Sequence, residues 1–411
     1  MFCGIDWAED HHDIALVTDH GSLAAKLRIT DDVEGLNQLL ALLAEHGDTP
    51  EDPIPVAIET SRGLLVSCLR ATGRPVYAIN PMAVARYRER HSVARKKSDH
   101  LDAMTLANIL RTDMATHRPL PADSDLARAV AVLARAQQDA VWDRVQAANK
   151  LRSHLREYYP ALLAAFAGTR EGICAPAARA LLAAAPTPAQ AARLTAAQLR
   201  SMLKRAGRTR GINAEAQRLK AILRADYLHQ PPLVEDAMGR QALALLRQLD
   251  AACTSCADLE TAAVDSLDQH PDAEILTSFP GLGKLTAARV LGEIGDDRSR
   301  FADARALKAY AGSAPVTRAS GKSTFVIHRR VKNQRLAAAG YSWAFSALTA
   351  SPGARAHYDR RREAGDRHIA AQRNLFNRLI GCLHHCLTTR QLYSETIAFP
   401  NPTTVPDTQA A

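Results

Sequence analysis

The sequence has few cysteines and no long apolar run. Its seven Cys are spread over 411 residues without the dense spacing of a disulfide-stabilised secreted protein, so we expect reduced thiols. No apolar stretch approaches the roughly 20 residues that a membrane-spanning helix needs. The first residues, from Met1 to Asp6, contain neither a basic leader nor the apolar segment of a secretory signal. We therefore expect a cytoplasmic protein without a membrane partner.

Two cysteine pairs have spacings that zinc sites also use. They are Cys253 with Cys256, and Cys382 with Cys386, which encloses two histidines. Zinc ligation is one interpretation. Both pairs lie in Ala- and Leu-rich stretches with helical periodicity, where small buried thiols are far commoner, and we favour that second interpretation.

Acidic residues are fewer than basic residues. Asp and Glu total 43 against 52 Lys and Arg, which gives a formal net charge of +9. This balance favours a polyanionic partner, and nucleic acid fits better than a membrane surface. The length exceeds one typical domain, and the hydrophobic content of 47% indicates a globular protein of two or three domains.

The N-terminal pattern alternates short apolar strands with helices. It predicts three strands within 2–30, a helix from 33, a strand at 55–59, a helix at 63–71, a strand at 75–79 and a helix from about 82. This order matches the ribonuclease-H-like α/β fold, in which the first and fourth strands lie side by side at the centre of a mixed sheet. Asp6 and Glu59 end those two strands, so we expect them at one edge of the sheet.

Two further carboxylates follow on a predicted helix. Asp99 and Asp102 are three residues apart after a plausible N-cap, Ser98, so they share one helix face. Each acid alone is more simply a strand-end or first-turn residue. Four acids brought together would raise one another's pKa unless a cation compensates them. Because hard oxygen ligands select Mg²⁺ or Mn²⁺, we predict that Asp6, Glu59, Asp99 and Asp102 form a metal site.

A basic run precedes the paired acids. It contains Arg86, Arg88, Arg90, Arg95, Lys96 and Lys97. Such runs are usually a solvated face. Beside a metal site, this one is placed to bind a nucleic-acid backbone.

The middle of the chain is helical. Residues 123–166 predict one long amphipathic stretch, stopped near Pro160, which is either a spacer or a dimerising coiled coil. Residues 170–265 are Ala-rich and interrupted by prolines. Their basic loop, with Lys204, Arg205, Arg208 and Arg210, is either a solvated connection or a nucleic-acid contact.

The sequence Phe-Pro-Gly-Leu-Gly at 279–283 stands between two helical patterns. It is typical of a helix-hairpin-helix motif, in which Gly281 and Gly283 let the backbone approach a phosphate and Lys284 opens the next helix. An ordinary tight turn between packed helices is the alternative.

A loop that leaves helical periodicity follows at 310–322. Ser320 precedes Gly321 and Lys322 there, and a conformationally free serine near positive charge suits attack on a phosphodiester. On chemistry alone Ser313 and Ser323 are equal candidates. Arg329 and Arg330 follow and could hold DNA or neutralise the transition state.

Taken together, these motifs resemble the DEDD transposases, the recombinases of bridge-RNA-guided insertion sequences. The N-terminal resemblance is carried by Gly-Ile-Asp at 4–6, Ala-Ile-Glu-Thr at 57–60, Ile-Asn-Pro at 79–81 and Lys-Ser-Asp-His-Leu-Asp-Ala at 97–103. The C-terminal resemblance is carried by the motif at 279–283, Arg-Phe at 300–301, Ala-Tyr-Ala-Gly at 309–312, Ala-Pro at 314–315 and Ala-Ser-Gly-Lys at 319–322.

The resemblance implies a RuvC-like N-terminal domain in which the four acids bind Mg²⁺. It implies that Ser320 forms a covalent phosphoserine link to a DNA end. It also implies assembly from dimers, with a tetramer as the larger form, in which the acids of one subunit serve the serine of another. An RNA from the element would pair with donor and target DNA.

We therefore expect five parts. They are a RuvC-like domain at 1–120, a helical linker or coiled coil at 121–170, a helical insertion without assigned role at 171–268, a mainly helical transposase domain at 269–392, and a disordered tail at 393–411. Two other functions fit the same residues. One is a metal-dependent nuclease in which water attacks instead of Ser320, and the other is a non-catalytic protein that bridges nucleic acid.

Overall fold

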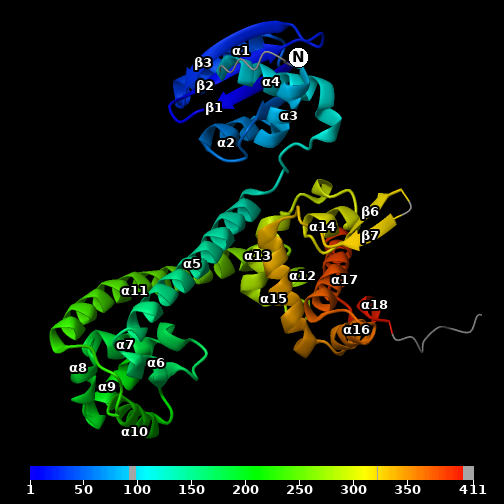
Figure 1. The fold of residues 1–411 in the computed structure, drawn as a ribbon. Helices are drawn as coiled ribbons and strands as arrows, with labels where there is room; N and C mark the ends of the chain where they lie inside the picture. The colour runs from blue at the N-terminus through cyan, green and yellow to red at the C-terminus, as the bar shows by residue number, and fades with distance from the viewer. Residues whose placement is uncertain (92–98, 322, 401–411) are drawn as a thin grey trace, which may run out of the picture. The chain divides into compact units, whose positions relative to one another are not determined.

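The computed structural model describes residues 1–91, 99–321 and 323–400, without the side chains of residues 91, 99 and 100. The chain forms two compact units, one ending at Ala122 and the other beginning at Asp123 (Figure 1). No helix within these described ranges is both long and apolar enough to cross a bilayer.

The N-terminal unit contains the strands and helices that the sequence pattern predicts. In chain order they are β1 Phe2–Trp7, β2 His11–Val17, β3 Leu23–Thr30, α1 Val33–Glu45, β4 Val56–Ile58, α2 Leu64–Ala71, β5 Val76–Ala78, α3 Pro81–His91, α4 Asp99–Asp113 and the 3₁₀ turn η1 Met114–Thr116. The sheet order is β3-β2-β1-β4-β5. β1 pairs antiparallel with β2 and parallel with β4, which confirms that the first and fourth strands are central neighbours.

Helices cover both faces of this mixed sheet. On one face, Ile5 and Ile14 pack with Leu39 of α1 and Leu69 of α2. On the other face, Ala57 packs with helices α3 and α4, which contribute Val84, Leu106 and Leu110. Because successive strand residues point to opposite faces, one short strand supplies side chains to both cores.

Two long helices run through the second unit. α5 Asp125–Arg156 packs along α11 Pro232–Asp268 (Figure 1), so its apolar stripe has a partner within the chain. The first helix of the predicted stretch ends at Arg156, close to the stop expected near Pro160, and α6 Pro160–Phe166 follows as a separate helix. Proline lacks the backbone N–H and disfavours helical geometry in the preceding residue, which explains the break.

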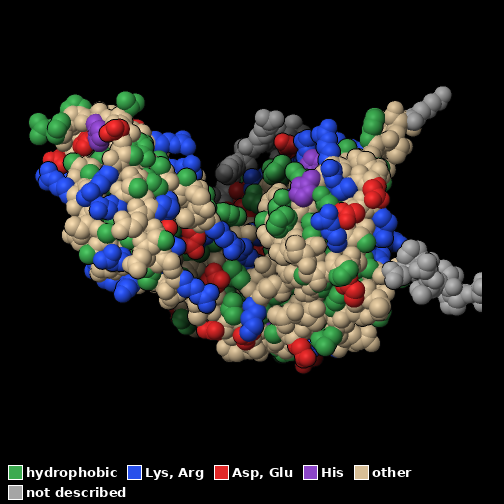
Figure 2. Space-filling view, turned by 90° about the horizontal axis from the view of Figure 1, so that it is seen from below, with side chains coloured by type: hydrophobic (Ala, Val, Ile, Leu, Met, Phe, Trp, Pro, Cys, Tyr) green, Lys and Arg blue, Asp and Glu red, His purple; other side chains and the backbone are tan. Residues whose placement is uncertain are grey.

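Short helices gather at one end of the α5–α11 pair and form what we call the distal lobe, residues 160–230. They are α6, the 3₁₀ turn η2 Gly172–Cys174, α7 Pro176–Ala184, α8 Pro188–Ala192, α9 Ala196–Arg205 and α10 Ile212–Leu223. Their core includes Leu155 of α5 and Leu249 of α11. Figure 2 shows the lobe at the left, with Lys and Arg side chains spread over it.

The other end of the unit is mainly helical, as predicted. Its elements are α12 Ala273–Thr277, α13 Lys284–Ile294, η3 Arg298–Arg300, α14 Ala304–Tyr310, β6 Val316–Ser320, β7 Ser323–Ile327, α15 Gln334–Ala350, α16 Pro352–Glu363, α17 His368–Thr389 and α18 Glu395–Ala398. Their core surrounds the fully buried Trp343.

The C-terminal segment differs from the prediction of a disordered tail from 393. Residues 393–400 include α18, and Glu395 of this helix accepts hydrogen bonds from Ser351 and from the backbone N–H of Gly353. These contacts tie residues 393–400 to α16, and the prolines that suggest a tail, Pro400, Pro402 and Pro406, stand at or beyond the end of this segment. Residues 401–411 lie outside the described part.

Candidate active site

The carboxyl ends of β1 and β4 bring two of the predicted acids to neighbouring positions. Ile5 pairs with Ile58 in parallel register; Asp6 is the next residue of β1, and Glu59 directly follows the last residue of β4. Neither side chain is fully buried. The sheet topology therefore places Asp6 and Glu59 at neighbouring positions of one end of the sheet, where the sequence predicts them.

Strand alternation assigns Asp6 to the face covered by α4. Gly4 has no room for a Cβ, because that atom would overlap the backbone of Ala103 and Ala107 in α4. Asp6 is two residues further along β1 and therefore shares the face of Gly4. The close approach of strand and helix depends on this glycine.

Asp102 precedes the helix residue that touches Gly4. It is only 6% exposed, and Arg88 of α3 forms an ion pair with it at 2.6 Å (Nη2 to Oδ1). Arg88 was predicted to bind a nucleic-acid backbone, but here it compensates a buried carboxylate. An unpaired charge in that position would be strongly destabilising.

The structure describes only some of the other residues predicted for the site. Asp99 is the first residue of α4, and its side chain lies outside the described part. Arg95, Lys96 and Lys97 also lie outside it. Arg86 and Arg90 are exposed on α3 and keep the solvent access that a phosphate contact requires.

Sequence reasoning did not identify Asp13. This buried residue of β2 is the antiparallel register partner of Asp6. Arg28 of β3 donates to both of its carboxylate oxygens, at 3.1 and 2.8 Å. The strand register supplies the only signal for this neighbour, and no local motif contains it.

The donor chemistry of this edge fits a divalent cation. Asp6, Glu59 and Asp102 offer carboxylate oxygens, which are the ligands that Mg²⁺ and Mn²⁺ prefer. Among the side chains that the structure describes, no three acidic, His or Cys groups are close enough together to hold a metal ion in this arrangement. Asp102 has one oxygen engaged by Arg88. A complete ligand set would need Asp99 or a rearrangement of this ion pair.

Ser320 ends the first strand of an exposed β-hairpin. It pairs with Ser323 across the turn, where Gly321 adopts a left-handed φ of 57°. Both serines are exposed. Ser313 is only 3% exposed, and its Oγ lies 3.2 Å from the Lys308 carbonyl and 3.1 Å from Asn377 Oδ1. The structure thus separates Ser313 from the two accessible candidates; Lys322 lies outside the described residues.

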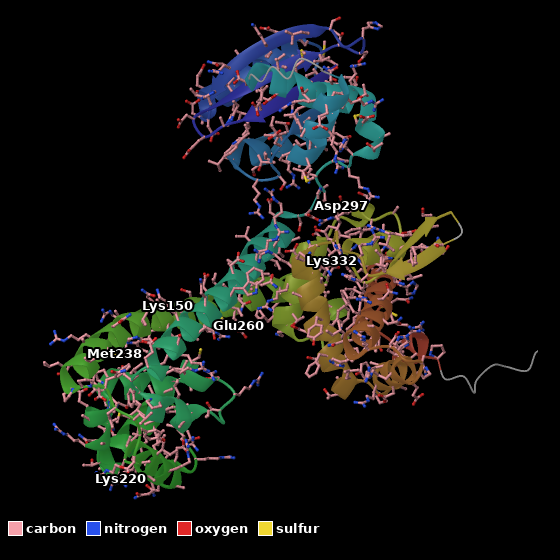
Figure 3. The ribbon with its side chains drawn as sticks, viewed as in Figure 1. Lys150, Lys220, Met238, Glu260, Asp297 and Lys332 are labelled. Atoms are coloured by element: carbon pink, nitrogen blue, oxygen red, sulfur yellow. The ribbon has the colours of Figure 1, made fainter. Side chains whose placement is uncertain are left out.

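A polar network anchors the chain where it returns from the hairpin. Asn333 Nδ2 donates to Glu293 Oε2 at 2.6 Å and to the Tyr310 hydroxyl at 2.7 Å. Arg135 of α5 binds both oxygens of Glu293, at 2.7 and 3.0 Å, and this hydrogen bonding raises the pKa of Arg135. Lys332, labelled in Figure 3, packs its aliphatic chain over Gly312. Neither Glu293 nor Asn333 was identified from the sequence.

The motif at 279–283 forms a turn between α12 and α13, a position that the helix-hairpin-helix interpretation and the tight-turn alternative share. Gly281 has a φ of +73°, and a Cβ there would overlap the backbone of Ala347 in α15. Internal packing therefore already requires this glycine. Gly283 is exposed and open, whereas Lys284 forms a 2.6 Å ion pair with Asp268. A phosphate contact at this turn stays a prediction.

The two arginines after the hairpin differ in accessibility. Arg330 is exposed, whereas Arg329 is half-buried. The Nε of Arg329 is buried and has no hydrogen-bond partner within the described residues. Only Arg330 therefore offers its whole guanidinium to a phosphate group.

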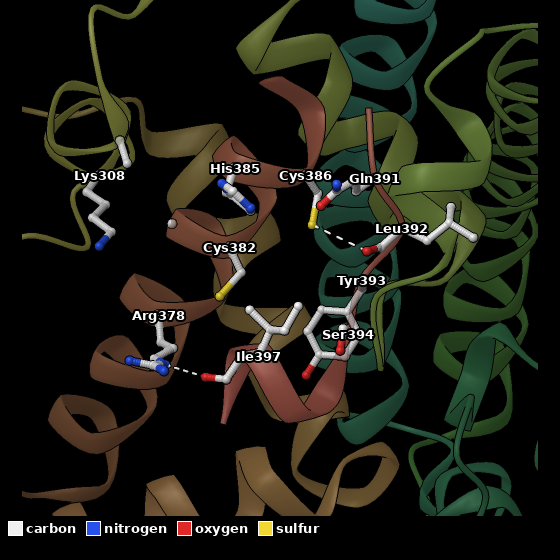
Figure 4. A pocket seen from close by; sticks show the side chains of 13 residues that line it. Lys308, Arg378, Cys382, His385, Cys386, Gln391, Leu392, Tyr393, Ser394 and Ile397 are labelled. Carbon is white, nitrogen blue, oxygen red and sulfur yellow. Dashed lines mark hydrogen bonds between the residues drawn. The ribbon is translucent and has the colours of Figure 1, made fainter. Parts of the chain in front are cut away.

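A cavity of about 410 Å³ lies between α17 and the C-terminal segment (Figure 4). Cys382, Cys386 and Arg378 line it, and no residue of the β6–β7 hairpin does.

Burial raises the pKa of the Cys382 and Cys386 thiols. Burial likewise raises the pKa of Cys253. Cys256 and Cys386 are buried and Cys253 and Cys382 partly buried, which is the environment expected of small core thiols.

Comparisons with known proteins cover both ends of the chain. A family model described as "Transposase" matches residues 3–160, and one described as "Transposase IS116/IS110/IS902 family" matches 273–359. The first range includes the four predicted acids, and the second includes Ser320. Neither model matches residues 161–272.

Individual relatives extend over almost the whole chain. The mini-circle putative transposase for IS117 of Streptomyces coelicolor is 66% identical over 97% of this chain and 96% of its own length. The IS900 uncharacterized 42 kDa protein of Mycobacterium paratuberculosis is 27% identical, over 96% and 97%. The IS110 uncharacterized 43.6 kDa protein of Streptomyces coelicolor is 30% identical over 72% of both chains.

Proposed function

Because this chain belongs to the IS116/IS110/IS902 family of transposases, we propose that it exchanges DNA strands through a covalent phosphoserine at Ser320. Transposases are enzymes that cut and join DNA, so a purely bridging role is set aside. The observation that carries the proposal is the position of Ser320. It is exposed at a hairpin turn, inside the matched family region, whereas Ser313 is buried.

In the proposed cleavage step, the Ser320 Oγ attacks a backbone phosphorus atom. An Oγ–P bond forms while the P–O bond to the adjoining nucleotide breaks. The serine hydroxyl loses its proton, and the released sugar hydroxyl gains one. In the joining step, a sugar hydroxyl of another strand attacks the phosphoserine and releases the serine, so the number of phosphodiester bonds is conserved.

The acids at the sheet edge are proposed to hold Mg²⁺ or Mn²⁺. Asp6, Glu59, Asp99 and Asp102 would be the ligands, and a bound ion would stabilise negative charge on the transferring phosphate. Support comes from the adjacent strand ends of Asp6 and Glu59 and from the contact between β1 and α4. Arg88 would position Asp102 rather than contact nucleic acid directly.

The remaining partners follow from the family resemblance. We propose donor and target DNA as substrates, a bridge RNA that selects them, and a dimer or tetramer in which the acids of one subunit serve Ser320 of another. The acids and the serine belong to different compact units of the chain, which is compatible with such a shared site.

The test is to trap the protein–DNA link. The full chain is incubated with the element's DNA ends, its flanking noncoding RNA and Mg²⁺, and denaturing gels detect the adduct. We expect Ser320→Ala to abolish the adduct and Ser323→Ala, its exposed cross-strand partner, to retain it. An adduct that persists in Ser320→Ala and disappears in Ser323→Ala would reassign the nucleophile.

A metal-dependent nuclease is the second candidate function. It is favoured by the same paired strand-end acids, which would then activate water. In that case DNA ends would be cut without an adduct, Ser320→Ala would still cut, and Asp6→Ala would not.

A further inference from the structure

The distal lobe holds a large excess of positive charge. Residues 160–230 contain eleven Lys and Arg but three Asp and Glu, a net +8, whereas the whole chain has +9. The next 38 residues, 231–268, which are Pro231 and the whole of α11, contain seven acids and two Arg. Positive and negative charge are thus segregated within one unit, and a single-sign patch of this kind attracts a polyanion.

The highest density of cations lies at the turn from α9 to α10. Lys204 and Arg205 end α9, and Arg208 and Arg210 follow in the turn; all four are exposed. On the inner side of α9, Leu199, Met202 and Leu203 are buried in the lobe core. The helix that carries these cations is therefore held in place by the packing of its apolar face in the lobe core.

Few of these cations are neutralised internally. Glu215 is shared by Arg218 at 2.7 Å and Arg208 at 3.8 Å. Within the described residues, no acid forms an ion pair with Lys204, Arg205 or Arg210. These three exposed cations therefore remain available to an external polyanion. Lys220, labelled at the tip of the lobe in Figure 3, adds to the same charge.

The lobe offers no platform for unstacked bases. Its two aromatic residues are Phe166, which is 5% exposed, and Tyr227, which is partly buried. Proteins that bind single strands usually stack bases on exposed aromatic rings. A positively charged surface without such rings favours the phosphate backbone of a duplex, which it contacts independently of sequence.

The adjacent helix restricts where a duplex can lie. Exposed acids, including Asp258, Glu260 and Asp265, follow α11 away from the lobe, and Glu260 is labelled in Figure 3. They would repel phosphates along that helix. The charge pattern therefore confines a polyanion to the end of the lobe.

We propose that the α9–α10 turn, centred on Lys204, Arg205 and Arg210, is a sequence-independent docking surface for duplex DNA. Its choice of DNA rests on the proposed strand-exchange function. The surface lies in the stretch that neither family model matches, and it uses none of the residues assigned to cutting.

The test measures how binding depends on salt. Full-length protein with Ser320→Ala, which prevents covalent capture, is titrated with a blunt DNA duplex of random sequence. The logarithm of the binding constant falls linearly with the logarithm of the salt concentration, and each lost phosphate contact makes this negative slope shallower by about 0.9. Lys204→Gln/Arg205→Gln should therefore lower the slope by about 2. The matched control, Arg240→Gln/Arg247→Gln, changes two exposed arginines of α11 and should leave the slope unchanged.

Three outcomes would overturn the docking surface. The first is an unchanged slope in Lys204→Gln/Arg205→Gln. The second is an equal loss in both double variants, which would indicate net charge alone. The third, from the same titration with an RNA duplex of the same length, is a loss for RNA without a loss for DNA. If the double variant misfolds, a single Arg210→Gln variant gives a second test, in which the salt-dependence slope should become shallower by about 0.9. Because binding is measured without chemistry, a failed phosphoserine mechanism would leave this result intact.

Discussion

Gly4 of β1 and Ala103 of α4 touch backbone to backbone, with no space between them for a methyl group. This contact joins β1, which carries Asp6 next to its last residue, to the helix that carries Asp102. The candidate metal site therefore depends on a glycine that offers no ligand of its own.

Gly4→Ala should destabilise the N-terminal unit by about 3 kcal/mol or more, because overpacking a rigid backbone contact is costly. Chemical unfolding of the purified protein measures the change. Gly168→Ala is the control, because its Cβ would meet open space. An unchanged midpoint for Gly4→Ala would mean that β1 and α4 can separate without loss.

Asp6→Asn should reduce Mg²⁺-dependent DNA cutting about 100-fold or more, as expected for the loss of a ligand that stabilises phosphoryl transfer. Asp13→Asn is the matched control, since Asp13 is the register partner of Asp6 and is held by Arg28. It should cost about 1 kcal/mol of stability and retain cutting. Equal losses of cutting in the two variants would show that this edge tolerates no change of charge.

Asn333→Ala should lower stability by about 2 kcal/mol, because it removes the N-cap of α15 and a donor to Glu293. The Ser320 adduct should fall with it, since the hairpin loses its anchor. Asn333→Asp separates the two causes. It keeps a cap but sets a second carboxylate against Glu293, so its stability should recover as pH falls. Unchanged stability and adduct yield in Asn333→Ala would exclude the anchoring role.

Glu395→Gln should flatten the acid dependence of Tm. Burial raises the pKa of Glu395, but hydrogen bonds from Ser351, Tyr393 and Gly353 outweigh it and lower the pKa below the ordinary 4.5. The stabilisation is therefore complete above that value and is lost as pH falls through the lower folded-state pKa.

The comparison for this variant is Glu363→Gln, an exposed position on α16. Calorimetry from neutral to acid pH gives Tm for each protein. If the Glu395→Gln profile parallels that of the wild type, Glu395 contributes nothing to acid sensitivity. At neutral pH the substitution should cost about 1 kcal/mol.

The sequence by itself determined the element order of the N-terminal unit and the turn at 279–283. Both follow from local causes: strand and helix periodicities, and glycine or proline at the breaks. Asp6 and Glu59 were found the same way, because a residue at the end of a strand can be located before its partner strand is known.

Only the tertiary structure decided that Arg88 pairs with Asp102, that Asp13 adjoins Asp6, that Ser313 is buried, and that α5 packs on α11. Each result depends on which distant segments meet. Their contacts are set by burial and charge compensation across the fold, and these energies leave no signature in the local order of residues.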